Sequence, residues 1–503
     1  MELSLFIMIT IVTTFPSLKE DVRLIAVNDT VYSIPAYSHD YELTPKDVEI
    51  LRRADVIVST SHTHFEEKIR EMKECGELKG ILIEIPKIHG IKFLRYPRTE
   101  IVNPHMPIYD PNNYKVFVRS LAEVLQSVNP DGNYLKRSEE LCKRIDELLS
   151  RERLNGTALV DYPFAQYAVS WLGLNVVDVA FNEPMMRLKS VDYLVLTKPL
   201  SVRSRALMEN VGHKALIYID SPFSNKSILE KLEDIEIEES SSDQSLTVLK
   251  WLLTVTLASV MYGTVSPIVY ARRLQFLSAA SSHTALLAVL ISIPLSSYIP
   301  SFVTALIVSL ILMYSVGYAI SKGIDPNVST SILVSFTASS SVLAMYYIVT
   351  NYEVGMDVWA LILGDPLLTT WNDLTILFIV TLLVVTITML TYREQFHIGL
   401  DRDCATFCVN VKIYDFIFYT ILAISTVAMI KIVGFVLQHV LILLPCAIAM
   451  RFAKGSKRLI LSSLFISTCA SILGLMLAMK LNLSPSGVIG IVMFSFYALR
   501  WFR

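Results

Sequence analysis

The stretch EESSSDQSLTVLKWLLTVTLASVMYG, residues 238–263, marks the point where the chain changes character. Its first eight residues are polar, and from Leu246 onward the chain is a series of apolar runs near 20 residues long. Runs of that length cross roughly 30 Å of hydrocarbon. From Leu246 to the end there are 15 Lys and Arg against 9 Asp and Glu, whereas the first 245 residues hold 29 against 37. An acidic, hydrophilic half therefore precedes a basic, apolar half.

The apolar half predicts nine membrane spans. The sixth and seventh are the weakest, because the 39 residues from Lys412 to Met450 must cross twice and turn near Gly434. Eight full spans plus a broken one is therefore the alternative. The predicted spans are 247–268, 274–297, 300–321, 328–350, 371–391, 413–433, 436–451, 459–479 and 485–502.

The Lys and Arg residues predict the orientation of these spans, because cytoplasmic loops carry the positive excess. If Leu246 lies outside the cell, twelve basic residues fall on the inner side, and only Lys250, Lys431 and Lys480 fall outside. We therefore expect a multi-pass protein of the plasma membrane. Its acidic half is extracytoplasmic and its C-terminus is cytoplasmic.

The acidic half alternates short apolar strands with amphipathic helices, which is typical of parallel α/β sheets. A long helix near the middle predicts two lobes. Residues 1–15 are either a signal segment or a first strand, and Ile7–Thr14 favours the strand. The expected organisation is an α/β domain over 1–238, a linker over 239–246 and an all-α membrane domain of eight or nine helices over 247–503.

The composition excludes several classes of protein. Hydrophobic residues make up 53% of the chain and charged residues 18%, which excludes a disordered chain and makes a wholly soluble one improbable. The sequence shows no clustered basic face, so a nucleic-acid partner is not expected. Six Cys are too few for a disulfide scaffold, and whether Cys75 and Cys142 pair is left open. The chain has no P-loop motif, so it is not expected to hydrolyse ATP.

Four segments of the acidic half carry residues that could bind a metal ion. His39 and His105 lie in loops, and Asp161 and Asp220 follow predicted strands. The carboxyl ends of strands face the ligand crevice in open α/β sheets. Two imidazoles and two carboxylates would neutralise a divalent cation and supply four donors. His62 and His64 flank a helix start and are second choices, because surface histidines are commoner than ligands.

At these residues the sequence resembles a family. His39-x-Tyr41-Glu42-x-Thr44-Pro45 and Pro104-His105 followed by Asp110-Pro111-Asn112 look like the ligand motifs of zinc/manganese solute-binding proteins of ABC importers. Ile219-Asp220-Ser221-Pro222 sits where that family has its last Asp ligand. The resemblance implies two lobes joined by a rigid helix. The family's third ligand falls on Tyr162 by strict counting, and we expect its neighbour Asp161 instead.

The apolar half resembles the ABC-3 metal permeases that partner such proteins. The matching segments are Gly263–His283, Leu363-Gly364-Asp365, Gly434–Ala449 and Ser484-Pro485-Ser486-Gly487. The loop with Asp401, Arg402 and Ala405 lies where that family docks its ATPase. An ionisable residue inside a span is costly and usually functional, so His283 and His439 are candidates for the transport pathway.

These resemblances imply an importer in which receptor and permease are fused. The expected substrate is Zn²⁺ or Mn²⁺, with no catalytic cofactor, and the expected partners are a separate ATPase, a second copy of the chain and the lipid bilayer. Three alternatives stay open. They are an importer of an iron chelate or cobalamin, a metal-sensing membrane receptor, and a membrane-anchored metalloenzyme.

Overall fold

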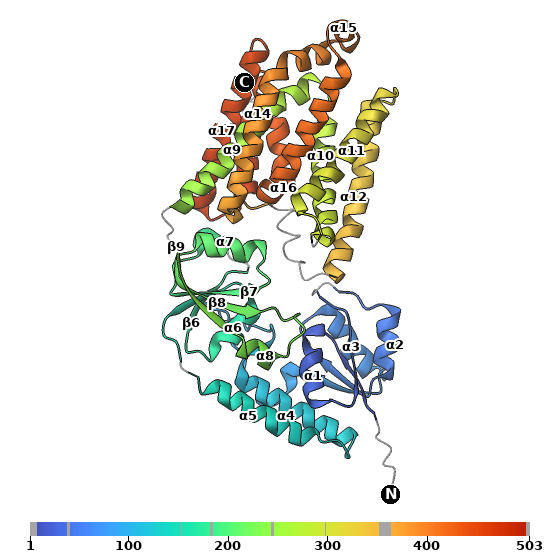
Figure 1. Ribbon diagram of the computed structural model, residues 1–503, viewed down its shortest axis with the longest axis vertical. Helices are drawn as coiled ribbons and strands as arrows, with labels where there is room; N and C mark the ends of the chain where they lie inside the picture. Colours follow the sequence, from blue (N-terminus) through green and yellow to red (C-terminus); the bar gives the residue numbers. More distant parts are fainter. Residues whose placement is uncertain are drawn as a thin grey trace. The chain divides into compact units, whose positions relative to one another are not determined.

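The computed structural model describes residues 8–37, 41–151, 153–181, 185–242, 246–296, 298–351 and 364–498. The chain forms two compact units, and the main division falls between Asp243 and Gln244. The first unit is α/β and the second is helical, as the sequence predicts (Figure 1).

The first unit contains two sheets. One has the order β2-β1-β3-β4 and is parallel throughout. The other has the order β6-β5-β7-β8-β9, in which only β9 is antiparallel. The strands are β1 (Thr10–Thr13), β2 (Thr30–Ser33), β3 (Val56–Ser59), β4 (Ile81–Glu84), β5 (Thr157–Val160), β6 (Asn175–Val179), β7 (Tyr193–Lys198), β8 (His213–Asp220) and β9 (Glu236–Ser242).

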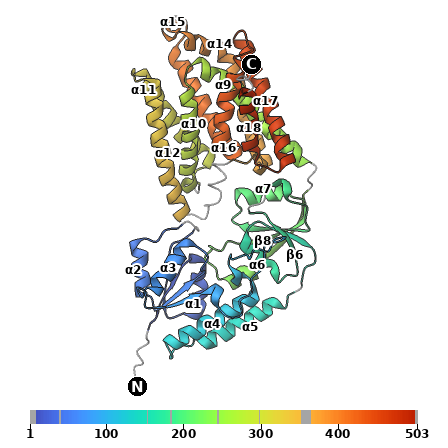
Figure 2. The same ribbon diagram turned by 180° about the vertical axis from the view of Figure 1, so that it is seen from behind.

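Helices pack on both sheets and connect them. The pair α4 and α5 runs along both lobes (Figures 1 and 2), so the predicted connecting helix is an α-helical hairpin. One hydrophobic core continues from β1 through Phe117 and Leu121 of α4 to β8. The helices are α1 (Lys19–Ile25), α2 (Pro45–Arg53), α3 (His64–Glu74), α4 (Pro111–Val128), α5 (Tyr134–Leu149), α6 (Pro163–Ser170), α7 (Val202–Asn210) and α8 (Ile228–Glu233), with short 3₁₀ turns at Pro16–Leu18, Ile85–Lys87, Pro107–Tyr109 and Met185–Arg187.

Two details of the first unit resolve or correct the sequence predictions. Thr10–Thr13 is the strand β1, inside its sheet, so the strand interpretation of this segment is confirmed. β9 runs to Ser242, so the segment predicted to be a linker from 239 begins as a paired strand.

Cys75 is exposed and Cys142 is buried, and both are free thiols.

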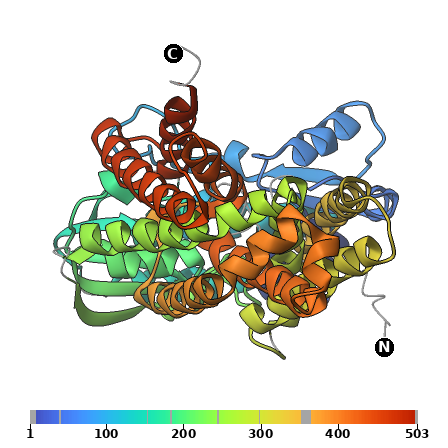
Figure 3. The same ribbon diagram turned by 90° about the horizontal axis from the view of Figure 1, so that it is seen from above.

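The second unit is a bundle of apolar helices. Among the residues that the structure describes, eight helices are long and apolar enough to cross a membrane, and Pro485–Ala498 is a shorter apolar helix. In Figure 3 the yellow helices α11 and α12 lie on one side of the bundle and the red α17 and α18 on the other. The helices are α9 (Thr247–Ala271), α10 (Gln275–Leu295), α11 (Ser301–Ser321), α12 (Pro326–Asn351), α14 (Trp371–Leu400), α15 (Arg402–Thr406), α16 (Val411–Ala449), α17 (Ser456–Leu481) and α18 (Pro485–Ala498), with a 3₁₀ turn η6 at Pro366–Leu368.

The element α16 is a helical hairpin. Gly434 has a left-handed φ of 74°, and the side chain of Gln438 donates a hydrogen bond of 2.7 Å to the carbonyl of Thr426. Twelve residues of continuous helix would separate these groups by about 18 Å, so the chain must turn back between them. The two predicted spans that share this segment therefore correspond to helices 411–430 and 432–449.

Three segments singled out in the sequence meet at this turn. A Cβ on Gly364 would lie 2.2 Å from the backbone nitrogen of Gly434, so only glycine permits this approach. The hydroxyl of Ser486, at the start of α18, donates to the carbonyls of Gly364 and Val433. These three segments, all part of the resemblance to the permease family, thus form one junction near the start of α9.

Candidate metal site and transport pathway

His105 lies in the loop that leads into α4. Its backbone N–H donates 3.0 Å to the side chain of Asn103, which is fully buried. The amide of Asn103 in turn donates to the carbonyl of Pro163 and to Gln166 of α6. Met106, the next residue, has a left-handed backbone (φ 52°). The loop that carries His105 is therefore held tightly to the second lobe.

His62 follows β3 and lies against His105. The ring centroids are 5.4 Å apart and the rings are nearly perpendicular at 84°. Only 8% of the His62 side chain is exposed, and its Nδ1 lies 2.7 Å from the hydroxyl of Thr60. The preceding Ser61 has a left-handed φ of 53°. The structure therefore brings together His105 and His62, a first-choice and a second-choice ligand.

A buried carboxylate supports this pair. Glu66 accepts hydrogen bonds from the hydroxyls of Thr14, Ser59, Thr60 and Thr63, and from the backbone N–H of His62. Burial alone would raise the pKa of Glu66, but the His62 imidazole and these hydrogen bonds together hold it below its usual value. A negative charge therefore stays beneath His62, at 3.7 Å from Nδ1.

His64, another predicted candidate, is not part of this arrangement. The His64 side chain is 94% exposed and lies 3.3 Å from Glu67. His39 lies outside the described residues. Among the described residues, no cluster of three or more His, Cys, Asp or Glu side chains could hold a metal ion.

Asp161, the predicted third ligand, is surrounded by hydrogen-bond donors. Its carboxylate is buried and accepts hydrogen bonds from the backbone N–H and hydroxyl of Thr197 and from the hydroxyl of Ser204, at 2.7–2.9 Å. Burial raises the pKa of Asp161 to about 6, although those hydrogen bonds act in the opposite direction. Both oxygens are committed to tying β5 to β7 and α7.

Tyr162, the alternative at the third position, packs in an aromatic cluster. Its ring lies 6.3 Å from that of Phe164 and 5.8 Å from that of Phe181. Successive residues of an extended segment point to opposite sides, which separates Tyr162 from Asp161. Counting along the sequence could place the third segment but could not show which way its side chains point.

Asp220 ends β8, and its side chain is 22% exposed. It accepts from the ammonium of Lys226 at 2.8 Å, and Lys226 also pairs with Asp234. Phe223, three residues later, contacts Tyr37 of the first lobe with ring centroids 5.7 Å apart. The loop after Asp220 therefore reaches across to the other lobe.

In the helical unit the two candidate pathway histidines come together. His283 of α10 and His439 of the second half of α16 have ring centroids 6.0 Å apart. Phe435 contacts both rings, at 4.5 and 4.7 Å, and its carbonyl lies 2.9 Å from Nδ1 of His439. Phe435 directly follows Gly434 and belongs to the segment Gly434–Ala449, which resembles the permease family.

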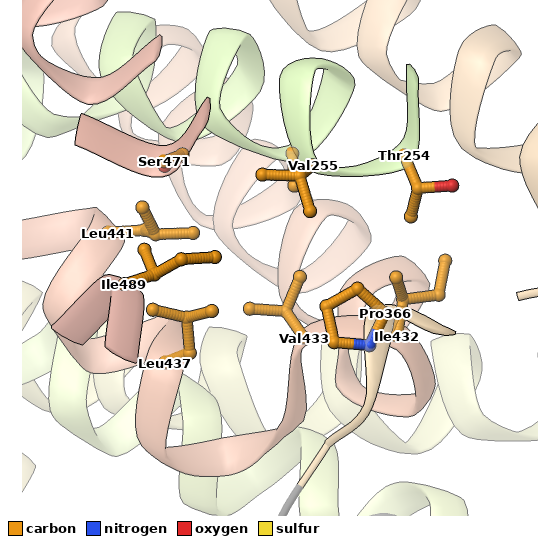
Figure 4. A pocket seen from close by; sticks show the side chains of 10 residues that line it. Thr254, Val255, Pro366, Ile432, Val433, Leu437, Leu441, Ser471 and Ile489 are labelled. Atoms are coloured by element: carbon orange, nitrogen blue, oxygen red, sulfur yellow. The ribbon is translucent and has the colours of Figure 1, made fainter. Parts of the chain in front are cut away.

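An apolar pocket lies on another side of the same hairpin. Figure 4 shows the side chains of Val433, Leu437 and Val255 turned toward it, with Pro366 at one edge. The hairpin of α16 therefore packs against α9 through apolar contacts and presents its histidine toward α10.

At the end where α9 stops, charged residues join four helices. Asp415 of α16 binds Arg272 at 2.8 Å and Arg402 of α15 at 2.5 Å. Arg272 also donates to Gln395 of α14. Asp415 was not among the predicted functional residues. Its position as a lone acid in the apolar run Ile413–Tyr419 could have indicated a role, because ionisable residues within spans are usually functional.

The segment that contains Asp401, Arg402 and Ala405 packs against these charged residues. Asp401 caps α15, and Ala405 is buried against Ile398 and Val411. Gly399 allows close approach, since a Cβ there would lie 2.0 Å from the carbonyl of Ala271. The loop is therefore fastened to α9, α14 and α16 through both apolar and charged contacts.

Two family models match the chain. One, described as the ABC 3 transport family, matches residues 244–503. The other, described as zinc-uptake complex component A, periplasmic, matches residues 11–187. The start of the first match, at residue 244, agrees with the main division between the two units.

Individual relatives also match the chain. A probable metal transport system membrane protein of Thermotoga maritima is 27% identical over 239 residues, which are 47% of this chain and 83% of that protein. One of Chlamydia muridarum is 28% identical over 144 residues, 28% of this chain. This match spans 49% of the Chlamydia protein, about half its length.

Solved structures resemble parts of the chain at low identity. PsaBC from Streptococcus pneumoniae is 20% identical with a TM-score of 0.45, covering 50% of this chain and 90% of that one. The solute-binding protein FpvC of Pseudomonas aeruginosa, in complex with Mn²⁺, is 20% identical with a TM-score of 0.38, covering 45% and 94%.

Proposed function

The chain belongs to the ABC 3 transport family through residues 244–503, and from that premise we propose that it imports a divalent metal ion, Zn²⁺ or Mn²⁺. Its first unit captures the ion and its second unit moves it across the membrane. The observation that carries this proposal is the pair of imidazoles, His62 and His105, in a unit that shares its chain with a permease. Imidazole suits zinc and related transition ions.

The capture site is proposed to include His105 and Asp220, together with His39, which lies outside the described residues. Asp220 would have to exchange its contact with Lys226 for the ion. The names of the relatives, which are metal transport proteins, support a metal ion over a chelate or cobalamin. The metal ion is substrate here and not a resident cofactor.

The translocation pathway is proposed to pass His283 and His439. Two neighbouring imidazoles inside an apolar bundle offer a transient site of weak affinity for the same ion. Ionisable groups at such depth are costly and therefore usually functional. The turn at Gly434 positions His439 and Phe435 together, so movement of this hairpin would change the site.

The partners are proposed to be a separate ATPase and a second copy of the chain. The ATPase would dock on the loop of Asp401, Arg402 and Ala405, on the cytoplasmic side. The excess of Lys and Arg on that side supports an extracytoplasmic first unit and a cytoplasmic C-terminus. The exposed apolar faces of the bundle would contact lipid and the second copy.

The test is metal uptake by the intact chain. Cells that express the chain with an ABC ATPase from the same genome are given radioactive Zn²⁺ or Mn²⁺. His105→Ala should abolish uptake at low metal concentration, whereas His89→Ala, a change at a histidine of a different loop, should not. Uptake equal to that of cells without the chain, for both ions, would contradict the proposal.

A further inference from the structure

The third position of the capture site has no suitable donor where the sequence places it. Both carboxylate oxygens of Asp161 accept hydrogen bonds from Thr197 or Ser204, and Tyr162 packs between Phe164 and Phe181. A divalent ion held by three protein donors at most would keep open positions for water. The site therefore calls for a donor from another segment.

We propose that His62 is that donor. The ion is then bound by the imidazole of His62 and by that of His105, in the loop that leads into α4. This inference rests on the proposed function and assigns one more ligand to its capture site. His62 comes from the loop after β3, a segment that carries none of the three resemblance motifs. Its ring already lies 5.4 Å from that of His105.

The spacing of the two rings fits a shared ion. Two imidazoles that bind one tetrahedral ion through Zn–N bonds of about 2.1 Å have ring centres about 5 Å apart. The observed centroid separation of 5.4 Å needs only a small adjustment to reach that value. Both rings sit near the carboxyl ends of strands or in the loop between lobes, where an α/β sheet binds ligands.

The surroundings of His62 are those of an oriented metal ligand. Metal-binding histidines typically use one ring nitrogen for a hydrogen bond that fixes the orientation of the ring, and a carboxylate often stands behind it. For His62 the Thr60 hydroxyl lies 2.7 Å from Nδ1. The Glu66 carboxylate lies behind it and is held by at least five donors.

The backbone gives a second, independent indication. Two residues next to the imidazoles have left-handed backbone conformations, which residues other than glycine rarely adopt. They are Ser61, just before His62, and Met106, just after His105. Such residues are strained and cluster at ligand sites, where the surrounding structure enforces them. Both turns that present the facing imidazoles are strained in this way.

A site rich in imidazole has a consequence for selectivity. Imidazole donors favour zinc, copper and nickel, whereas carboxylates favour harder ions such as manganese. Exchanging the expected Asp161 carboxylate for His62 therefore shifts the site toward Zn²⁺. It also leaves the bound ion less completely neutralised, which Glu66 offsets from behind the ring.

The test compares two histidines that are two residues apart. The purified full-length chain in detergent is titrated with Zn²⁺ and with Mn²⁺ against a competing chelator. His62→Ala should weaken Zn²⁺ binding at least about 100-fold, because loss of even an outer-shell partner typically costs roughly 10- to 100-fold. His64→Ala is the matched control and should bind like the unchanged chain, because its side chain is 94% exposed.

Further variants separate a lost ligand from a damaged fold. His62→Cys supplies another zinc donor and should keep Zn²⁺ within about tenfold, and His62→Asp should narrow the preference for Zn²⁺ over Mn²⁺. Thr60→Val, which removes the orienting contact, should cost about 10- to 100-fold. Equal Zn²⁺ affinity in His62→Ala and the unchanged chain would overturn the inference. An unchanged chain that binds neither ion would instead overturn the proposed function.

Discussion

Replacing Asp415 should destabilise the helical unit more than replacing Arg402, the partner whose side chain is exposed. Asp415 forms ion pairs with two guanidinium groups, and the two differ sharply in burial. The Arg272 side chain is 3% exposed, whereas that of Arg402 is 47% exposed. Asp415→Ala therefore leaves one buried positive charge without its partner, with a second positive charge nearby.

The size of the effect follows from burial. Removing one partner of a buried ion pair typically costs about 3–5 kcal/mol, because the remaining charge stays desolvated. An exposed ion pair is worth about 1 kcal/mol or less. We therefore expect Asp415→Ala to lower the thermal midpoint of the detergent-purified chain strongly, and Arg402→Ala to change it little.

The same pair of variants examines the link to transport. Arg402 joins the proposed docking loop to Asp415, and Asp415 joins α16 to Arg272 at the end of α9. Arg402→Ala should therefore reduce metal uptake even though the purified chain stays stable. If Arg402→Ala destabilises the chain as much as Asp415→Ala does, the assignment of stability to the buried pair is wrong.

Three further outcomes are expected. Asp161→Asn should keep Zn²⁺ affinity within about threefold in the chelator titration, because an amide can still accept from Thr197 and Ser204, whereas loss of a true ligand costs at least about 100-fold. Burial raises the pKa of Asp21 from 3.8 to about 6, although the charge of Lys231 and the hydrogen bond from Tyr114 act to lower it. The folded state thus binds this proton more tightly, and stability should fall by about 3 kcal/mol as the pH rises from about 4 to about 6. Asp21→Asn should remove that slope in urea unfolding followed by Trp171 fluorescence, with the other Trp residues replaced by Phe. His283→Ala should abolish uptake without changing the metal affinity of the first unit. Ser281→Ala is the control and should leave both uptake and affinity unchanged, because the Ser281 hydroxyl bonds its own helix.

The parts of the fold that follow from periodicity were predictable. Apolar runs near 20 residues predicted most helices of the second unit to within a few residues, because the bilayer imposes their length. The exception is α14, which continues to Leu400, beyond the predicted end at 391. Strand-helix alternation likewise predicted parallel sheets, and β1 to β8 bear this out. β9 was not predictable in this way, since Glu236–Ser242 is polar and acquires its strand conformation by pairing with β8.

The candidate site was predictable only in part, because ligand residues depend on side-chain direction. Sequence position brought Asp161 to the end of a strand, but Thr197 and Ser204 from β7 and α7 decide where its carboxylate points. His62 looked like a surface histidine, and it is buried only because Phe15 and His105 pack against it. Both outcomes depend on residues distant in the sequence, so spacing along one segment could not reveal them.

The fusion changes what the capture site has to do. β9 ends at Ser242 and α9 begins at Thr247, so a chain of five peptide steps, at most about 18 Å long, joins receptor to permease. A tether this short keeps the effective concentration of the receptor at or above roughly the mM range. A free receptor must hold its ion tightly enough to survive diffusion to the membrane, whereas a tethered one must only hold it until the next transport cycle. The ligand set can therefore be tuned for selectivity and release instead of maximal affinity, and an imidazole taken from outside the expected ligand segments meets that requirement.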